Sequence, residues 1–270
     1  MALVSVERRG GAAVITYANP PLGTMTATGS AEMLAAVTAA SEDPEVRAIV
    51  LTGGLPGIFI RHYDVGELSQ LGERLADPAP PASQPPSTQP NGGKPGGAFG
   101  ELVDALAAAP KPVIAAINGL CMGGGFEISL ACDIRIAARD AEAIGLPETR
   151  VGIFPGGGGT QRLPRVIGEA RALEMILRGR TVTGAEAAQI GMVHEAVDDA
   201  LARALEIAAE FESKGAEGVA YAKRLTRAAL DRPLAEGLAD ERRSFVQVMR
   251  TAGARQGLKA GLPPNEIQEL

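Results

Sequence analysis

Short apolar segments that alternate with helical patterns restrict most strongly how this 270-residue chain can fold. The segments VRAIVLT (46–52), PVIAAI (112–117) and DIRIAA (133–138) are apolar over most of their length, as strands buried on both faces are. A helical pattern covers residues 98–108, and another begins at Gly125. This alternation predicts an α/β fold with a mainly parallel sheet and helices on its faces.

The N-terminal segment predicts a hairpin followed by a helix. Residues 2–7 and 12–17 flank a Gly10–Gly11 turn, which indicates two antiparallel strands. Ser30 is the predicted N-cap of a helix that runs to about Asp43.

Strand patterns stop at about residue 197, and we therefore divide the chain into a core of residues 1–197 and a helical region of residues 198–270. Apolar residues at helical spacing predict three or four helices in the second part. These helices either pack back on the core as a layer or lie between subunits, and their spacing does not separate the two alternatives.

Residues 77–97 read DPAPPASQPPSTQPNGGKPGG, which is too rich in proline and glycine for a helix or a paired strand. We interpret them as a mobile insertion within the core, because the strand and helix patterns resume after them. A lid or recognition loop is one alternative, and a plain surface loop is the other.

Composition limits the classes of partner. Aromatic residues make up 3% of the chain and its net charge is -6, so we expect no nucleic acid partner. No apolar run approaches the roughly 20 residues that span a bilayer, and the N-terminus lacks the pattern of a secretory leader. Cys121 and Cys132 are expected to be buried thiols. We therefore predict a cytoplasmic protein without a membrane partner.

The stretch CMGGGFE (121–127) lies where a strand pattern gives way to a helical one. Glycine at such a turn permits positive φ and close approach of another molecule to the backbone. The unpaired N–H groups of a helix start suit an anion or a developing oxyanion, although tight packing of helix on sheet explains glycine there as well. The stretch lacks the lysine of a phosphate-binding P-loop and the spacing of a dinucleotide fingerprint.

Two glutamates accompany this turn. Glu127 stands in the first turn of the predicted helix, where a carboxylate complements the helix dipole without any further role. Glu148 lies in the apolar, loop-like stretch AIGLPETRVGIFPGG, where a carboxylate is unexpected. Two carboxylates near an oxyanion turn are what proton transfer beside a carbonyl requires. The second glycine run, 156–159, is interpreted as structural.

The segments KPVIAAINGLCMGGGFEISLACDIRIAA and GLPETRVGIFPGGGGTQRLPRVIG closely resemble the enoyl-CoA hydratase/isomerase (crotonase) family. The similarity covers most of residues 1–197. It implies a crotonase-like spiral of ββα units with a C-terminal helical region, usually assembled as a homotrimer or a dimer of trimers. It also implies an acyl-CoA thioester as substrate, with coenzyme A as part of that substrate and no separate cofactor.

The resemblance carries roles onto individual residues. Backbone N–H groups of Tyr63 and Gly124 are the implied oxyanion hole, and Glu127 and Glu148 are the implied catalytic carboxylates. Glu148 is assigned as the main acid/base group and Glu127 as the partner that orients water and acts as base. The predicted contacts with substrate around them are Arg61, His62, Asp64, Gly123 and Gly125.

Two departures from the family pattern affect these expectations. A pattern like FxAGAD reads FIRHYD (59–64) here, so bulky side chains border the acyl pocket, where they either narrow it or add a hydrogen bond. Arg61 and His62 alternatively point to solvent or to the CoA phosphates, and the histidines lack metal-ligand spacing, so no metal site is expected. The C-terminus is not the usual basic, aromatic helix, and Lys259 is the only nearby cation that we can offer for CoA.

The retained glutamates favour a 2-enoyl-CoA hydratase. A second hypothesis keeps the fold and changes the reaction to Δ3,Δ2 isomerisation or thioester hydrolysis, because FIRHYD reshapes the pocket. A third is a non-catalytic acyl-CoA-binding member whose altered loop blocks the site.

Overall fold

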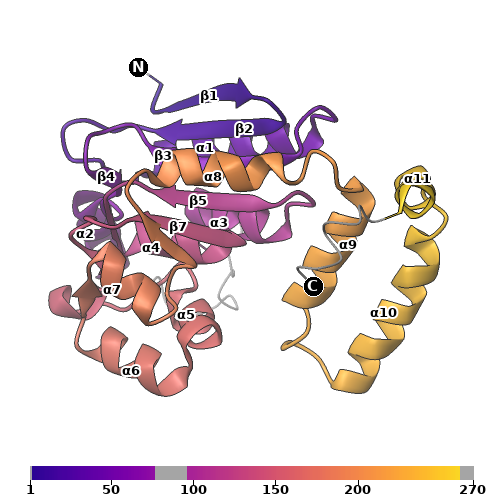
Figure 1. The fold of residues 1–270 in the computed structure, drawn as a ribbon. Helices are drawn as coiled ribbons and strands as arrows, with labels where there is room; N and C mark the ends of the chain where they lie inside the picture. The colour runs from indigo at the N-terminus through magenta and orange to yellow at the C-terminus, as the bar shows by residue number, and fades with distance from the viewer. Residues whose placement is uncertain (1, 77–95, 262–270) are drawn as a thin grey trace, which may run out of the picture.

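The computed structural model describes residues 2–76 and 96–261 (Figure 1). Its strands are β1 (Val4–Arg9), β2 (Ala12–Tyr17), β3 (Ala48–Gly53), β4 (Ile58–Ile60), β5 (Val113–Ile117), β6 (Leu120–Met122), β7 (Ile134–Ala138), β8 (Ile144–Gly145), β9 (Thr181–Val182) and β10 (Glu195–Val197). Its helices are α1 (Ala27–Glu42), α2 (Val65–Ala76), α3 (Gly97–Ala108), α4 (Gly124–Ala131), the 3-10 helix η2 (Glu148–Val151), α5 (Gly159–Ile167), α6 (Glu169–Leu177), α7 (Gly184–Gln189), α8 (Ala200–Ala209), α9 (Ala216–Arg227), α10 (Leu234–Val248) and α11 (Ala252–Ala260). The predicted insertion lies, apart from its last two residues, outside the described residues.

The main sheet has six strands in the order β1-β2-β3-β5-β7-β10, and the three apolar segments of the sequence form its centre. The hairpin β1–β2 is antiparallel, as predicted, and all other pairs in this sheet are parallel. Parallel strands need crossover connections, which here carry helices onto the faces of the sheet.

A second sheet of short strands, β4-β6-β8-β9, turns this arrangement into a spiral. Each of β3, β5 and β7 leads into one of its strands, β4, β6 or β8, and then into α2, α4 or η2. The predicted succession of ββα units is therefore present. Its consequence is that residues following β4, β6 and β8 meet on one side of the molecule.

Both faces of the central strands β2, β3, β5 and β7 are buried, which explains why these strands are mainly apolar. Side chains such as Val14, Val50 and Ile114 pack against α8 on one face. Their neighbours Ile15, Leu51 and the buried residues of α1 and α3 form the larger core on the other. Figure 1 shows α8 crossing the sheet on the face opposite to α1 and α3.

The predicted start of the first helix is wrong by one turn. Helix α1 begins at Ala27, and its N-cap is Thr26, whose side chain accepts a hydrogen bond from Gly29 N. Ser30 lies inside the first turn, where its hydroxyl donates to the carbonyl of Thr26 at 2.8 Å. Both residues suit a cap, and the Met25–Tyr63 bridge just before the helix fixes which of them serves.

Of the two predicted alternatives for the C-terminal region, packing on the core as a layer is observed for α8, and a position between subunits stays a prediction. Helix α8 packs on the sheet as a layer, through Ala200, Ala204, Ile207 and Ala208. Helices α9, α10 and α11 form an arm that extends to the side of the core (Figure 1). This arm exposes large apolar side chains on α10, among them Leu234 and Phe245.

Candidate active site

The turn between β6 and α4 positions the first backbone amide of the site. Gly123 is the N-cap residue with φ of 50°, a conformation that favours glycine. Gly124 is the first residue of α4, so its N–H has no partner within the helix. Gly125 packs so closely on β4 that an added Cβ would lie 2.1 Å from the carbonyl oxygen of Ile60. Close packing of helix on sheet is therefore observed at Gly125, and the oxyanion role of the Gly124 amide stays a prediction.

Tyr63 brings a second amide to the same place. It lies in an isolated parallel bridge with Met25, in which Met25 N donates to His62 O and Asp64 N donates to Met25 O. That pattern leaves the N–H of Tyr63 pointing away from the bridge. A Cβ built on Gly124 would lie 3.2 Å from Cβ of Tyr63, so the two backbones are adjacent. Within residues 2–76 and 96–261, neither amide donates to another residue.

Glu127 lies one turn into α4, with 3% of its surface exposed. Its Oε1 accepts hydrogen bonds from Gly157 N at 2.7 Å and from Gly159 N at 2.8 Å. Burial raises the pKa of Glu127, and the two amides together with the charge of Arg162 counteract that rise. A buried carboxylate with two backbone donors is stabilised in its ionised form.

Glu148, at the start of η2, is in the opposite situation. Its Oε2 is buried and has no hydrogen-bond partner in the part of the chain that the structure describes. Burial, together with a smaller contribution from the neighbouring charge of Glu127, raises the pKa of Glu148 to about 7, although hydrogen bonding to its own backbone acts in the opposite direction. A Cβ built on Gly123 would lie 3.1 Å from its Oε1, so this carboxyl lies beside the turn that carries the first amide.

These groups line one cavity of about 780 Å³. It brings together six of the nine predicted residues: His62, Tyr63, Gly123, Gly124, Glu127 and Glu148. Its walls are otherwise mainly apolar, with Leu68 and Leu71 from α2 and Ile153 and Phe154 beyond η2. A cavity with apolar walls and a few convergent polar groups is the usual form of a site for a small molecule.

Arg61, Asp64 and Gly125 are not among the described residues that line this cavity. Asp64 caps α2, since its side chain accepts from Glu67 N at 3.0 Å and from the hydroxyl of Thr24 at 3.2 Å. Arg61 joins β4 to its neighbours through its backbone, and Gly125 packs on Ile60. Their observed contacts are internal, and their contact with substrate stays a prediction.

The bulky residues of FIRHYD are held in defined positions. The Nδ1–H of His62 donates to the carbonyl of Tyr63 at 2.7 Å. The hydroxyl of Tyr63 donates to Oε2 of Glu67 at 2.9 Å, and its ring packs edge-on against Phe99 with 5.3 Å between centroids. This hydroxyl is therefore engaged with α2, and the Tyr63 ring is part of the cavity wall.

The interpretation of the run 156–159 as purely structural is wrong. Two of its amides hold Glu127, and Gly156 and Gly157 line the cavity. The position of Phe99 beside Gly124 was also missed. The sequence signal for the Glu127 contact is the presence of two turns of consecutive glycines, because both turns can expose backbone N–H groups to a nearby carboxylate.

Lys259 lies in α11, on the arm that Figure 1 places across the molecule from α2. Within this chain it is therefore remote from the cavity. In the described ranges, no group of three or more His, Cys, Asp or Glu residues is arranged to hold a metal ion. None of the helices there has the length and apolar character to cross a membrane.

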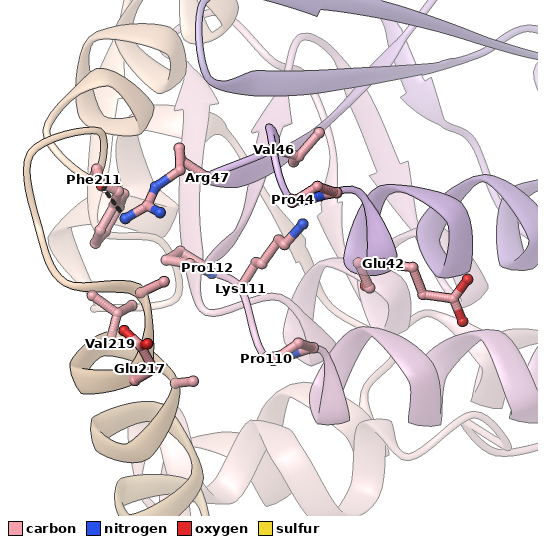
Figure 2. A pocket seen from close by; sticks show the side chains of 13 residues that line it. Glu42, Pro44, Val46, Arg47, Pro110, Lys111, Pro112, Phe211, Glu217 and Val219 are labelled. Carbon is pink, nitrogen blue, oxygen red and sulfur yellow. Dashed lines mark hydrogen bonds between the residues drawn. The ribbon is translucent and has the colours of Figure 1, made fainter. Parts of the chain in front are cut away.

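A second, smaller cavity of about 390 Å³ lies between the end of α1, the start of β3 and α9 (Figure 2). Its cations are already engaged: Lys111 donates to the carbonyls of Ala40 and Asp43, and Arg47 donates to those of Phe211 and Lys214. Figure 2 shows Arg47 reaching toward Phe211. The two carboxylates among the described residues that line this smaller cavity, Glu42 and Glu217, are exposed. We therefore regard the larger cavity as the candidate active site.

The ββα spiral with its C-terminal helical region defines a crotonase-type fold, which comparison with known structures confirms. The enoyl-CoA hydratase from Bacillus anthracis superposes with a TM-score of 0.82 and 31% identity, over 96% of this chain and 95% of that chain. The chain belongs to the enoyl-CoA hydratase/isomerase family, whose model matches residues 7–262.

Two relatives illustrate the range of the family. YngF of Bacillus subtilis is 48% identical over 161 residues, which are 59% of this chain. The mitochondrial methylglutaconyl-CoA hydratase of Homo sapiens is 36% identical over 231 residues, which are 83% of this chain. The chain spans 60% and 63% of the length of these two relatives.

Proposed function

We propose that the protein is an enoyl-CoA hydratase that adds water syn across the double bond of a 2-enoyl-CoA thioester. The observation that carries this proposal is the unequal pair of buried carboxyls in one cavity. Glu127 accepts two backbone hydrogen bonds, whereas Oε2 of Glu148 accepts none from the described residues and the pKa of Glu148 is raised to about 7. One group is suited to take a proton and the other to give one.

In the first half of the reaction, Glu127 removes a proton from water while the water oxygen bonds to Cβ of the enoyl group. The electrons of the double bond move toward the thioester oxygen, which becomes an enolate. The N–H groups of Tyr63 and Gly124 donate to that oxygen. Loss of one such donor typically costs about 2.7–4 kcal/mol of barrier.

In the second half, Glu148 delivers its proton to Cα and the enolate collapses to the 3-hydroxyacyl thioester. A carboxyl with a pKa of about 7 is protonated in roughly half of the molecules at neutral pH, which favours this role. Both carboxyls lie on one side of the bound thioester in this scheme, which gives syn addition.

Coenzyme A enters as part of the substrate, and the scheme requires no separate cofactor. The acyl-CoA thioester is the proposed partner, and a homotrimer or a dimer of trimers in the cytoplasm is the proposed state. The apolar side chains exposed on α10 support association of this kind.

The test is the absorbance of the conjugated thioester when the purified protein is given crotonyl-CoA and longer 2-enoyl-CoAs. We expect the absorbance to fall and mass spectrometry to show the addition of one water. Glu148→Gln should reduce kcat by about 10²–10⁴-fold, because the acid that protonates Cα is removed.

Glu142→Gln is the matched control, since Glu142 is exposed and stands two residues before Ile144–Gly145 of β8. A fully active Glu148→Gln enzyme would reject the assigned role. Turnover of a 3-enoyl or saturated thioester without hydration of any 2-enoyl-CoA would support isomerisation or hydrolysis instead. Binding of CoA thioesters without turnover of any would support a non-catalytic member.

A further inference from the structure

Glu127 depends on a short loop for its position. Both backbone donors to its Oε1 come from the run 156–159, at Gly157 and Gly159. A Cβ built on Gly157 would lie 2.8 Å from the other carboxyl oxygen, Oε2, so the loop borders both oxygens of this carboxylate. A displacement of this loop would move the carboxylate with it.

Arg162 holds this loop from the opposite side. Its Nη1 donates to the carbonyl of Gly157 at 2.9 Å. A Cβ built on Gly158 would lie 2.1 Å from that Nη1, so the guanidinium packs directly against the loop. The residue Gly157 therefore donates to Glu127 with its N–H and accepts from Arg162 with its C=O.

A positively charged, largely buried side chain is unfavourable at the position of Arg162, near the start of a helix. It lies four residues after Gly158, the N-cap of α5, where the helix dipole disfavours a cation. Its side chain is 23% exposed, and burial lowers its pKa. Its acidic partner is the exposed Asp104, 3.9 Å away, at the outer limit for an ion pair.

We propose that Arg162 is a positioning residue that acts through the Gly157 carbonyl to keep Glu127 in the geometry and charge state of the base. This inference rests on the proposed function in assigning the base to Glu127. Of the two carboxyls in the cavity, Glu127 is the one whose pKa the Arg162 charge lowers.

Other charges around this unit come from neighbouring elements. Glu148 of η2 faces Glu127, Asp104 of α3 faces Arg162, and Arg165 and Arg227 lie near Arg162. Asp104 offsets part of the positive charge, whereas Arg165 and Arg227 add to it. Removal of Arg162 therefore takes away both a positive charge near Glu127 and a hydrogen bond to the loop that holds it.

The experiment compares Arg162→Gln and Arg162→Lys with Arg165→Gln, which removes an arginine of the same helix that donates to Gln161 and Asp231 instead. In Arg162→Gln we expect kcat to fall by about 10²-fold with KM changed by less than about threefold, because the carboxylate is displaced. The acidic limb of the kcat/KM profile should move to higher pH, since a carboxylate that loses a nearby cation has a higher pKa. In Arg162→Lys, which keeps the positive charge, the limb should move less than in Arg162→Gln.

A second measurement does not depend on turnover. Carboxyl ¹³C NMR titration of protein labelled at glutamate, with Glu127→Gln to assign the signal, should give a higher pKa for Glu127 in Arg162→Gln and an unchanged value in Arg165→Gln. Thermal unfolding of each variant separates this effect from loss of the fold. The inference would be overturned if Glu127 titrated at the same pH in the wild type, in Arg162→Gln and in Arg165→Gln. If Arg162→Gln raises the pKa of Glu127 but the wild-type protein hydrates no enoyl-CoA, the positioning role of Arg162 is supported and the proposed function is rejected.

Discussion

The two acidic residues of the cavity differ because backbone amides of a second turn solvate Glu127, whereas Oε2 of Glu148 has no such partner among the described residues. Glu127 is buried and Glu148 is half-buried, and burial alone raises a carboxyl pKa. Glu127 recovers part of its lost hydration from Gly157 and Gly159, whereas the buried Oε2 of Glu148 recovers none from the residues that the structure describes. Local backbone geometry therefore separates the two protonation states, although both residues have the same side chain.

The raised pKa of Glu148 predicts a stability cost that grows with pH. Between about pH 4.3 and 7, the folded protein retains a proton that the unfolded chain has released, so the free energy of unfolding falls as pH rises through this window. Glu148→Gln removes the ionisable group and keeps its size. It should raise the free energy of unfolding at pH 8 by about 1–3 kcal/mol and have a smaller effect at pH 4.

Denaturant unfolding at the two pH values checks this prediction, with Glu142→Gln as the exposed control. An equal effect of Glu148→Gln at pH 4 and pH 8 would show that burial of its charge is not the cause. A stabilised but inactive variant would be a trade of stability for activity at this site.

At the scale of elements, close packing of α4 on β4 brings the first amide to its place. Glycine at 125 allows the helix backbone to approach the carbonyl of Ile60, and this contact fixes where Gly124 lies relative to Tyr63. The site is thus built from the ends of secondary structure elements, which are more rigid than long loops.

Gly125→Ala should therefore destabilise the protein, although alanine is normally the better helix former. The added methyl group would lie 2.1 Å from a backbone carbonyl that cannot rotate away, and overpacking of this kind costs about 1–3 kcal/mol or more. Gly237→Ala in α10 is the control, since nothing lies within 4 Å of a Cβ there. That change should stabilise α10 by about 0.5–1 kcal/mol. Thermal unfolding measures both, and equal effects would contradict the packing argument.

At the scale of the whole molecule, the C-terminal arm is joined to the core by a cluster of charges. Asp133, just before β7, accepts from Val113 N and pairs with Lys223 and Arg227 of α9, each at 2.7 Å. The side chains of Lys223 and Asp133 are 9% and 19% exposed. These contacts connect segments about ninety residues apart in the chain and fix where the arm leaves the core.

Asp133→Asn should weaken this connection strongly, because it removes the negative charge that pairs with Lys223 and Arg227. Removal of one member of a buried ion pair costs about 3–5 kcal/mol. The exposed pair between Arg139 and Asp198 is the matched control, and Asp198→Asn should cost less than about 1 kcal/mol. Denaturant unfolding compares them, and similar costs for both would show that the Asp133 cluster is not a buried connection.

Much of the fold could be predicted because its signals are local. The central strands are five or six residues long and mostly apolar, and the glycine turns mark where helices start. Strands β4, β8 and β9 are two or three residues long, which is too short for any periodicity. The choice between Thr26 and Ser30 as cap likewise depended on a contact with residues distant in the chain.

The sequence by itself determined the alternation of buried strands and helices, the turn at Gly123–Gly125 and the presence of two unusual glutamates, because hydrophobic period and turn chemistry act over a few residues. Only the tertiary structure decided which groups surround those glutamates. Gly157 and Gly159 reach Glu127 across 30 and 32 residues, and Tyr63 reaches Gly124 across a larger gap. Hydrogen bonding and burial depend on atoms brought together in space, so the protonation states that the proposed chemistry needs arise only when the chain folds.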